Sequence, residues 1–365
     1  MVILTVNAGS SSLKLSLVGD GDETLADREL PAPEAQVDPA ELERALRGGF
    51  GAAEAVAHRI VHGGQRFRAA VLVDAQVARE LRELTELAPL HQPKSLAALD
   101  AVSALLPRLP AVACFDTAFH ATMPPAAITY ALPLRWRERW GLRRFGFHGL
   151  SHSWVARRIP ELLSAHGEQP RIVSCHLGAG ASLCAIRGGE SIDTTMGFTP
   201  LEGLVMATRS GSVDPGMLLW LLEREALDER GLSEALEHQS GLAGLARSAD
   251  MRDILRRAAT GDPEAVLAID VYIHRLRAGV AAMAASLGGL DVLVFTGGVG
   301  EHQPEIRARA ADGLGFLGIA VDPAANRRQT GDGDITLPGA TVSALVLRAR
   351  EDAEMARQAR SALIR

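Results

Sequence analysis

Residues 2–18, VILTVNAGSSSLKLSLV, contain the strongest structural signal in the chain. An apolar, β-branched run ends at Asn7, small and polar residues follow, and apolar residues then alternate with polar ones from Leu13 to Leu17. Period-two patterns on both sides of a Gly/Ser turn predict a β-hairpin. Gly9 lets the backbone approach a ligand closely, and the nearby hydroxyl and N–H donors suit phosphate oxygens. A plain polar turn would need fewer residues, and from this stretch alone both interpretations stay open.

The second half of the chain repeats this arrangement. Residues 172–177 are a predicted strand, residues 178–182 form a Gly-rich turn, and residues 183–186 are a second strand. A third junction of strand, glycines and helix follows at residues 291–301. Two halves that each open with such a hairpin predict a duplicated α/β architecture of the βββαβα type. A nucleotide would meet phosphate-binding turns from both halves, so we expect the site in an interdomain cleft.

Apolar periodicity predicts the remaining elements. Helices are expected at residues 41–47, 75–87, 94–106, 214–225, 263–287 and from about 351, and strands at 55–61, 110–115 and 341–347. Residues 20–40, which are acidic and rich in Pro and Ala, are predicted to be a surface connection. Residues 123–147 are predicted to be irregular and to contain the domain crossover.

Composition sets limits on function. The 365 residues carry a formal net charge of −6, with 47% hydrophobic and 22% charged residues. This length predicts two domains, and the acidic balance argues against non-specific nucleic-acid binding. Three cysteines in apolar settings fit reduced, buried thiols of a cytoplasmic protein. We expect no signal peptide, because no basic segment precedes the first strand, and no membrane span, because no apolar run reaches about 18 residues.

Five long, ungapped motifs resemble the acetate kinase (acetokinase) family, in order and over the whole chain. They are Val6–Lys14, Phe115–His120, Gly146–Gly149, Met196–Gly203 and Thr208–Pro215. The resemblance implies the ribonuclease-H-like, actin/hexokinase-like fold, a homodimer, and direct in-line phosphoryl transfer between ATP and acetate, giving ADP and acetyl phosphate. It implies an N-terminal acetokinase domain of residues 1–120 plus the returning segment 350–365, and a nucleotide-binding domain of residues 121–349.

Transfer to a carboxylate needs a cation that orients the acceptor and positive charge on the moving phosphoryl group. Arg59 and Val61 share one face of a predicted strand, and a guanidinium beside an apolar side chain suits a small carboxylic acid. The alternative is a surface arginine beside an acidic residue. The resemblance assigns the acetate carboxylate to Arg59. It places around the methyl group the four residues Val61, Leu90, Phe147 and Pro200.

The resemblance implies that His148 and Arg209 stabilise the transition state and that Asp116 is the active-site acid. His148 and His152 have the i, i+4 spacing of a zinc site, but Gly149 weakens a helix there and no Glu lies between them. Acetate is already ionised at neutral pH, so no base is required. We therefore predict that Asp116 positions Mg²⁺ and its waters instead of accepting a proton.

The resemblance assigns Asn7 and Glu351 to Mg²⁺, for which Mn²⁺ is an expected substitute. Glu351 stands in an Arg-rich context that departs from the family pattern, and Asp352 is an alternative ligand. ATP is expected to contact the first hairpin and three segments of the second half. The nucleotide residues are Ser10, Ser12, Lys14, His176, Leu177, Gly178, Ala179, Gly180, Asp250, Met251, Arg252, Gly298, Val299, Gly300, Glu301 and His302.

The second hairpin departs from the family, which usually has Gly-Asn-Gly-Ser-Ser there. Ala179 and Ala181 lack the amide and the hydroxyl, so we expect nucleotide binding to be retained but weakened by about 1–3 kcal/mol if both groups were direct contacts. The main alternative function is a propionate or butyrate kinase, because one methylene discriminates by only about 1–3 kcal/mol. A non-catalytic, actin-like ATP-binding protein could dispense with Arg59, His148 and Arg209, and all three are present.

Overall fold

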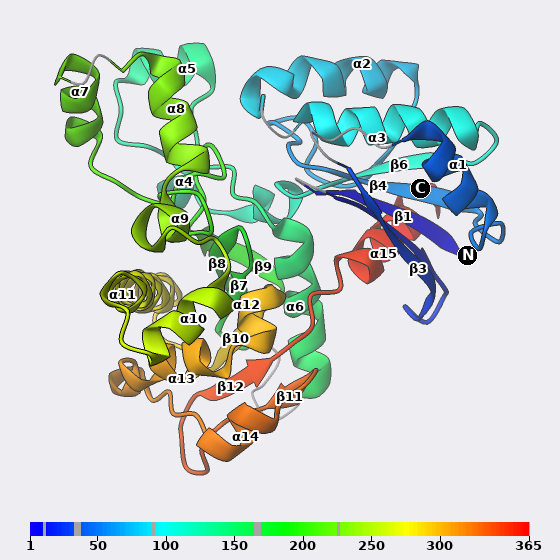
Figure 1. The fold of residues 1–365 in the computed structure, drawn as a ribbon. Helices are drawn as coiled ribbons and strands as arrows, with labels where there is room; N and C mark the ends of the chain where they lie inside the picture. Colours follow the sequence, from blue (N-terminus) through cyan, green and yellow to red (C-terminus); the bar gives the residue numbers. More distant parts are fainter. Residues whose placement is uncertain (10–11, 33–37, 90–91, 164–168, 225–226, 365) are drawn as a thin grey trace. The chain divides into compact units, whose positions relative to one another are not determined.

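The computed structural model describes residues 1–9, 12–32, 38–89, 92–163, 169–224 and 227–364 (Figure 1). The chain forms two compact units. Unit 1 consists of Met1–Ala121, Phe147–Trp154 and Arg350–Arg365, and unit 2 of Thr122–Gly146 and Val155–Ala349. None of the described helices is long and apolar enough to cross a membrane.

Unit 1 is built on a six-stranded sheet with the strand order β3-β2-β1-β4-β6-β5. Its strands are β1 (Ile3–Ala8), β2 (Ser12–Val18), β3 (Thr24–Pro31), β4 (Ala55–Ile60), β5 (Val71–Leu72) and β6 (Ala111–Phe115). The first three strands are antiparallel, and β1, β4 and β6 run parallel, so their carboxyl ends lie at one edge of the sheet. The predicted first hairpin is confirmed, with Asn7 opposite Lys14.

Helices cover both faces of this sheet (Figure 1). The helices of unit 1 are α1 (Pro39–Arg47), α2 (Ala75–Glu83), α3 (Gln92–Leu105) and α15 (Glu351–Ile364), with short 3₁₀ segments at Leu84–Leu87 and Ala118–Thr122. Because side chains alternate along a strand, Leu4 and Val6 pack toward α1 and α3, whereas Ile3 packs toward Met355 of α15. Alternate residues of a strand therefore pack on opposite faces of the sheet, one set against α1 and α3 and the other against α15.

Unit 2 repeats the sheet with the order β11-β12-β10-β7-β8-β9. Its strands are β7 (Ile172–Leu177), β8 (Ala181–Arg187), β9 (Glu190–Thr194), β10 (Val292–Thr296), β11 (Gly333–Asp334) and β12 (Ser343–Val346). Strands β7 and β8 form the second hairpin, and β7, β10 and β12 run parallel. The arrangement matches that of unit 1, including a short antiparallel strand at the edge, β5 there and β11 here. The predicted duplication is confirmed.

The long helix α11 (Pro263–Leu287) packs against β7, β8 and β9. The side chain of Asp262 accepts hydrogen bonds from the amides of Glu264 and Ala265 at its N-terminus, and Gly288 ends it with φ +69°. The other helices are α4 (Pro125–Ile128), α5 (Leu134–Trp140), α6 (Gly149–Leu162), α7 (Pro215–Arg224), α8 (Glu229–His238), α9 (Gly241–Ala246), α10 (Met251–Ala259), α12 (Gly297–His302), α13 (Pro304–Asp312) and α14 (Pro323–Arg328).

Two predictions of irregular structure are wrong. Residues 20–40 contain β3, whose side chains are almost all exposed or half-buried, so that no apolar alternation marks it. Its backbone pairing with β2 holds it in the sheet. Residues 123–147 contain α4 and α5, which are only one or two turns long and have no buried residues, and so leave no periodic signal.

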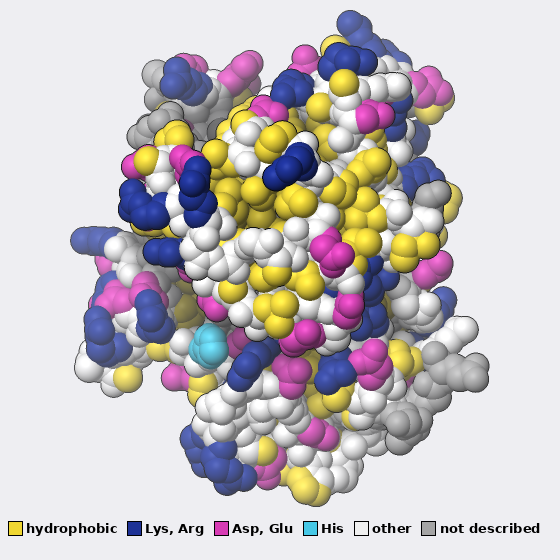
Figure 2. All heavy atoms as spheres, turned by 90° about the vertical axis from the view of Figure 1, so that its right-hand side faces the viewer, with side chains coloured by type: hydrophobic (Ala, Val, Ile, Leu, Met, Phe, Trp, Pro, Cys, Tyr) yellow, Lys and Arg dark blue, Asp and Glu magenta, His cyan; other side chains and the backbone are white. Residues whose placement is uncertain are grey.

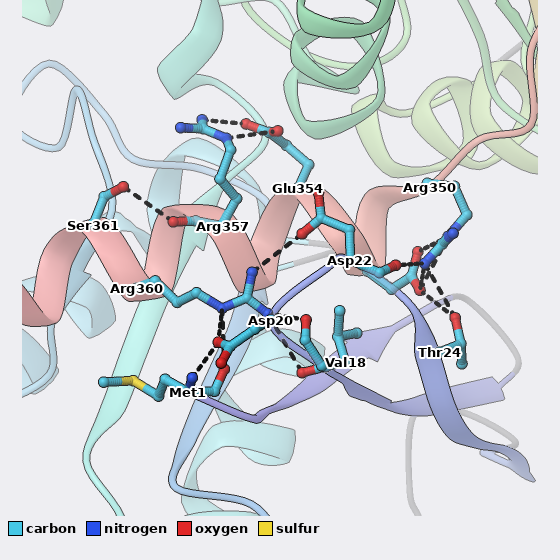
Figure 3. A network of polar contacts seen from close by, with 12 residues as sticks. Met1, Val18, Asp20, Asp22, Thr24, Arg350, Glu354, Arg357, Arg360 and Ser361 are labelled. Carbon is cyan, nitrogen blue, oxygen red and sulfur yellow. Dashed lines mark hydrogen bonds and ion pairs between the residues drawn. The ribbon is translucent and has the colours of Figure 1, made fainter.

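Polar contacts fix α15, and Arg350 just before it, against the N-terminus and the turn between β2 and β3 (Figure 3). Arg360 donates from Nη1 to Asp22 Oδ1 (3.1 Å) and from Nε to the Met1 carbonyl (3.1 Å). Arg350 donates from Nη2 to the Asp22 carbonyl (2.7 Å) and to Thr24 Oγ1 (3.1 Å). Glu351, the first residue of α15, accepts a hydrogen bond from Asn7 Nδ2 (2.8 Å) near the carboxyl end of β1.

Figure 2 views unit 1 from the side of α1 and the N-terminus. Hydrophobic side chains form a broad area in the upper part of this face, and basic and acidic side chains border it. The core between the sheet and α1 reaches the surface in part, since Val2, Ala53, Leu106 and Leu109 pack against it and are only partly buried.

Candidate functional site

Three parallel strands of unit 1 lead to polar side chains on the same face of the sheet. Asn7, Arg59 and Asp116 lie at or just beyond the carboxyl ends of β1, β4 and β6. In each strand, apolar residues that lie two or four positions before the polar residue belong to the core packed on α15. The period of two therefore places all three on the α15 side, where Glu351 begins the helix. The described part of unit 1 brings these four predicted residues together.

A chain of hydrogen bonds joins them. Arg59 donates from Nε to both carboxylate oxygens of Asp116 (3.1 Å each) and from Nη2 to Oδ2 (2.6 Å). Its Nη1 donates to Asn7 Oδ1 (3.1 Å), and Asn7 Nδ2 donates to Glu351 Oε2 (2.8 Å). The alternative interpretation of Arg59 includes an acidic partner at the surface, but the partner found here, Asp116, is only 1% exposed and is itself a predicted site residue.

The charges in this network do not balance. Asp116 is 1% exposed and Arg59 17%, so their attraction is weakly screened. Burial raises the pKa of Asp116, Arg59 lowers it, and Glu351 raises it again, with a net rise. Burial lowers the pKa of Arg59, but the negative charges of Asp116 and Glu351 raise it by more. The net change is a rise, so the guanidinium stays charged. Two carboxylates face one guanidinium, which favours a further cation.

The donor set fits Mg²⁺. Carboxylate and amide oxygens are the ligands that this ion prefers, and it usually keeps several waters. Asn7 and Glu351 would hold it, with Asp116 close by. Among the described residues, no group of three or more His, Cys, Asp or Glu side chains could hold a metal, so a site made entirely of such side chains is not found there.

Asp352, the alternative ligand, is engaged elsewhere. Its carboxylate accepts hydrogen bonds from Arg350 Nε (2.9 and 3.3 Å) and Nη2 (3.0 Å), and from Thr24 Oγ1 (3.3 Å). Glu351 Oε2, by contrast, accepts a hydrogen bond from Asn7 Nδ2 (2.8 Å). The structure favours Glu351.

The loop of His148 is fastened to the same network. His148 has φ +55°, an uncommon backbone conformation for a residue other than glycine. The Gly149 amide donates to the Asp116 carbonyl (2.8 Å), and a Cβ on Gly149 would lie 2.1 Å from that oxygen. The sequence predicts that Gly149 weakens a helix between His148 and His152. Gly149 is instead the first residue of α6, so the chain is helical from Gly149 onward. The glycine allows the loop to approach Asp116.

Phe147 is fixed from two sides. Its carbonyl oxygen lies 3.0 Å from His120 Nε2, and its ring packs edge-on against His62 with centroids 5.5 Å apart. Phe147 is 1% exposed and Val61 8%, as expected for apolar pocket walls. Leu90 lies outside the described residues, as does Ser10 of the first hairpin.

The first hairpin presents donors beside Asn7. The Gly9 amide donates to the Ser12 carbonyl (2.8 Å), and Ser12, which is half-buried, begins β2. Lys14 is exposed and lies opposite Asn7 in the antiparallel register. An ammonium group and an amide thus lie at neighbouring positions of the sheet.

Unit 2 carries glycine turns at the corresponding strand ends. In the turn after β7, the Gly178 amide donates to the Gly180 carbonyl (2.9 Å) and Ala207 donates to the Ala179 carbonyl (3.0 Å). Ala179 is exposed, Ala181 is fully buried, and His176 is half-buried. Glycine turns with exposed backbone suit the approach of phosphate groups.

The glycine-rich segment after β10 is the short helix α12. Gly297 has φ +77°, and a Cβ there would lie 2.8 Å from the Leu177 carbonyl. The Glu301 carboxylate accepts from the amides of Gly297 (3.0 Å) and Ala349 (2.9 Å). Arg307, which is fully buried, donates to the carbonyls of Gly300 and Glu301 (2.8 Å each). Arg307 was missed, because a single arginine in a helix carries no sequence signal.

The third predicted nucleotide segment begins α10. Asp250 caps the helix by accepting from the Arg252 amide (2.9 Å), and it also pairs with the Arg252 guanidinium (2.8 Å). Met251 is only 4% exposed, so its side chain belongs to the core. The pattern alone did not distinguish this core role from a ligand contact.

Arg209 is held within unit 2. Its Nη1 donates to the Pro200 carbonyl (2.9 Å), and its Nε lies 3.9 Å from Glu237 Oε2. Burial raises the pKa of Glu237, and Arg209 opposes this rise. The structure thus connects two predicted residues, one for the acyl pocket and one for the transition state.

Comparisons with known proteins agree with these features. Residues 42–357 match the model of the acetokinase family. The chain is 42% identical to an acetate kinase of Gloeobacter violaceus, with 98% of both chains covered, and 44% identical to one of Leifsonia xyli, with 99% and 98% covered.

Solved structures give the same result. An acetate kinase of Porphyromonas gingivalis matches with a TM-score of 0.90 and 36% identity over 99% of both chains. A propionate kinase of Francisella tularensis matches with 0.90 and 32% identity over 98% of both. The two mixed sheets with their helices form an α/β, two-domain, actin/hexokinase-like fold. The chain belongs to the acetokinase family.

Proposed function

We propose that this chain catalyses reversible, Mg²⁺-dependent phosphoryl transfer between ATP and acetate, giving ADP and acetyl phosphate by direct in-line displacement. The observation that carries the proposal is the network of Asn7, Arg59, Asp116 and Glu351 at the strand ends of unit 1. It provides a buried guanidinium for a carboxylate and oxygen ligands for a metal ion. The acetate kinases among its relatives support acetate as the acceptor.

Arg59 orients the acceptor carboxylate. A guanidinium has five N–H donors, and the hydrogen bonds of Arg59 to Asp116 and Asn7 use Nε and one donor on each terminal nitrogen. The remaining donors on the two terminal nitrogens serve the acceptor, while Asp116 fixes the plane of the group. Val61, Leu90, Phe147 and Pro200 surround the methyl group.

Asp116 has two proposed roles, one toward the metal ion and one toward Arg59. Acetate is already a carboxylate at neutral pH, so no base is needed. When bound through Asn7 and Glu351, Mg²⁺ supplies charge neutralisation to the phosphates. Asp116 orients the ion's water ligands and holds Arg59. Mn²⁺ is an expected substitute.

His148 and Arg209 stabilise the negative charge of the moving phosphoryl group in the transition state. Preorganised cations and donors at developing charge contribute strongly to phosphoryl transfer. The fixed backbone of His148 and the Pro200 contact of Arg209 support this role, because both limit reorientation during the reaction.

Most of the proposed nucleotide contacts belong to the proposed nucleotide-binding domain of residues 121–349, whereas Arg59, which would bind the acceptor carboxylate, belongs to the proposed N-terminal domain of residues 1–120 and 350–365. Met251 would contribute through its backbone, because its side chain is buried. The proposed nucleotide residues are Lys14, Ser10 and Ser12 in the first hairpin, residues 176–180 after β7, residues 250–252 at α10, and residues 298–302 in α12.

Hydroxylamine trapping tests the activity. The protein is incubated with ATP, Mg²⁺ and either acetate, propionate or butyrate, and hydroxamate is measured. Acetate should give the highest kcat/KM. Higher kcat/KM with propionate would reassign the acceptor, as the Francisella tularensis propionate kinase makes a specific alternative. No hydroxamate from any acid would overturn the kinase proposal.

The chain is proposed to be a cytoplasmic homodimer. Its three cysteines, all in the described part of the chain, are buried and form no disulfide, which fits a reducing compartment. Helix α7 has no buried residue, and its Met217, Leu219 and Trp220 are 44%, 65% and 51% exposed, as expected for an interaction surface. Sedimentation equilibrium should give twice the chain mass. Leu219→Asp combined with Trp220→Glu should reduce it, whereas a wild-type monomer at all concentrations would contradict the dimer.

A further inference from the structure

Three side chains of unit 2 fix the loop that contains Pro200. Glu202 accepts hydrogen bonds from Tyr130 Oη (2.5 Å at Oε2) and from Arg144 Nη2 (2.7 Å at Oε1). Arg144 also donates from Nη1 to the carbonyls of Thr195 (3.1 Å) and Met196 (2.9 Å). Its guanidinium carbon lies 5.5 Å from the centroid of the Tyr130 ring. The carboxylate is the central acceptor of this cluster.

The same cluster determines the path of the backbone at Gly197. Tyr130 Oη accepts from the Phe198 amide (2.9 Å), and the Gly197 carbonyl accepts from the amides of Phe145 (3.0 Å) and Gly146 (3.2 Å). A Cβ on Gly197 would lie 1.7 Å from Glu202 Oε2 and 2.2 Å from Tyr130 Oη. The two oxygens occupy the space of a side chain, so the loop closes directly over them.

The loop leads to two residues of the proposed reaction. Pro200 lies two residues before Glu202, and its carbonyl accepts from Arg209 Nη1 (2.9 Å). An error of about 1 Å in a reacting group can reduce the rate by about 10²-fold. A cluster that fixes Pro200 therefore also fixes the cation that is proposed to meet the phosphoryl group.

We infer that Glu202, with Tyr130 and Arg144, is a positioning group for Arg209 and for the acyl-pocket wall at Pro200. The inference rests on the proposed function, and no other part of the proposed chemistry uses these three residues. None of the three belongs to the proposed substrate or nucleotide contacts, and they act through the Pro200 backbone.

The exposure of the cluster separates this role from a structural one. The Glu202 side chain is 35% exposed and that of Arg144 17%. Because about a third of the Glu202 carboxylate side chain is open to solvent, this pair is screened more than the Arg59–Asp116 pair and should contribute less to stability. A large kinetic effect in a folded variant would therefore come from misplacement of the loop and not from loss of fold.

The test compares Glu202→Ala and Tyr130→Phe with Asp291→Ala. Asp291 also accepts two hydrogen bonds, one at each carboxylate oxygen, from the Arg171 guanidinium in unit 2 (2.7 and 3.0 Å); the two side chains are 27% and 35% exposed, and Asp291 has no proposed catalytic role. Glu202→Ala should lower kcat/KM for acetate by about 10–100-fold, and the KM for ATP should stay within about twofold of wild type. The ratio of kcat/KM for acetate to kcat/KM for propionate should shift by at least about threefold. Tyr130→Phe should do the same to a smaller extent, and Asp291→Ala should change neither quantity.

Two further measurements complete the test. Hydrogen exchange of the Phe198 amide should be faster in Tyr130→Phe than in wild type, with melting temperatures close to that of Asp291→Ala. In an Arg209→Ala background, Glu202→Ala should lower kcat by less than about threefold, because its effect passes through Arg209.

The outcomes separate the two proposals. An active wild type with unchanged Glu202→Ala kinetics overturns the positioning role alone. Equal losses in Glu202→Ala and Asp291→Ala also overturn it, in favour of a general stability effect. A wild type that forms no hydroxamate overturns the proposed function and, with it, this inference.

Discussion

The two units have the same sheet, but the carboxyl ends of their parallel strands carry different chemistry. Both have three antiparallel strands followed by parallel partners, with the orders β3-β2-β1-β4-β6 and β9-β8-β7-β10-β12. In unit 1 the strand ends hold charged and amide side chains. In unit 2 they hold glycines and backbone donors. The topology determines where a site forms, and the residues at the strand ends determine what it binds.

This difference is also electrostatic. Arg59 and Asp116 of unit 1 form a buried pair, whereas Arg171 and Asp291 of unit 2 form a pair that is about one-third exposed. Breaking a buried pair from one side is costly because a charge is left without a partner, and an exposed pair contributes little. Four predictions test how far the contrast extends.

The largest effect is expected for Asp116→Asn. It leaves the Arg59 guanidinium buried without its counterion, so the free energy of unfolding should fall by about 3 kcal/mol. Because Arg59 and the metal's waters both lose their orientation, kcat should fall by about 10³-fold or more, as for other groups that act on developing charge. Urea unfolding and hydroxamate rates at varied Mg²⁺ measure both.

Asp291→Asn is the matched control, with an expected loss below about 1 kcal/mol and normal kinetics. If Asp116→Asn kept near-normal rates and an unchanged Mg²⁺ dependence, the proposed metal role of Asp116 would be wrong. A stability loss equal to that of Asp291→Asn would show that burial of the first pair has no energetic consequence.

Arg209→Ala is expected to act almost entirely on the reaction. Loss of one positive group at the transition state should lower kcat by about 10²–10³-fold with a modest change in KM. Since Arg209 donates to the neutral Pro200 carbonyl and its Nε lies 3.9 Å from Glu237 Oε2, the melting temperature should change less than in Asp116→Asn. A rise in the KM for acetate at constant kcat would assign Arg209 to ground-state binding instead.

The sequence predicted much of this contrast, but not its contacts. Hairpins, parallel strands and long helices follow from periodicity, and the motifs supplied the site residues. Edge strand β3 was missed because its pairing is by backbone, and α5 because seven residues without burial show no period. The Arg59–Asp116 pair joins residues 57 positions apart, and the Tyr130–Glu202 bond residues 72 apart. Such pairings depend on packing, which one sequence does not specify.

Acidification should weaken unit 1 first. Burial lowers the pKa of His58 to about 3 and that of His62 to about 4. Both are neutral in the folded protein, and the unfolded chain binds more protons below about pH 6.5, so stability falls as the pH decreases toward the folded pKa values. Each of the two histidines should lower the free energy of unfolding by about 2 kcal/mol at pH 5. Neither ring nitrogen of His58 has a hydrogen-bond partner among the described residues.

Hydrogen exchange at pH 7.5 and 5.5 measures this difference by unit. Amides of β4 and β6 should lose protection more than those of β7 and β10. His58→Leu should reduce the pH slope of the unfolding free energy by about half, because one of the two neutral histidines is removed. An unchanged slope would show that another group causes the acid sensitivity.

The smallest effect concerns the second hairpin, where unit 2 lacks side-chain donors that unit 1 has. Ala179 is exposed and leaves space for an amide, so Ala179→Asn should lower the KM for ATP by about fivefold, the equivalent of one net hydrogen bond of about 1 kcal/mol. Ala259→Asn, at an exposed position near the end of α10, is the control and should leave it unchanged. Ser12→Ala in the first hairpin should raise the KM for ATP. If Ala179→Asn has no effect while Ser12→Ala weakens binding, the first hairpin already supplies the decisive side-chain contacts, and the glycine turn of unit 2 binds through its backbone alone.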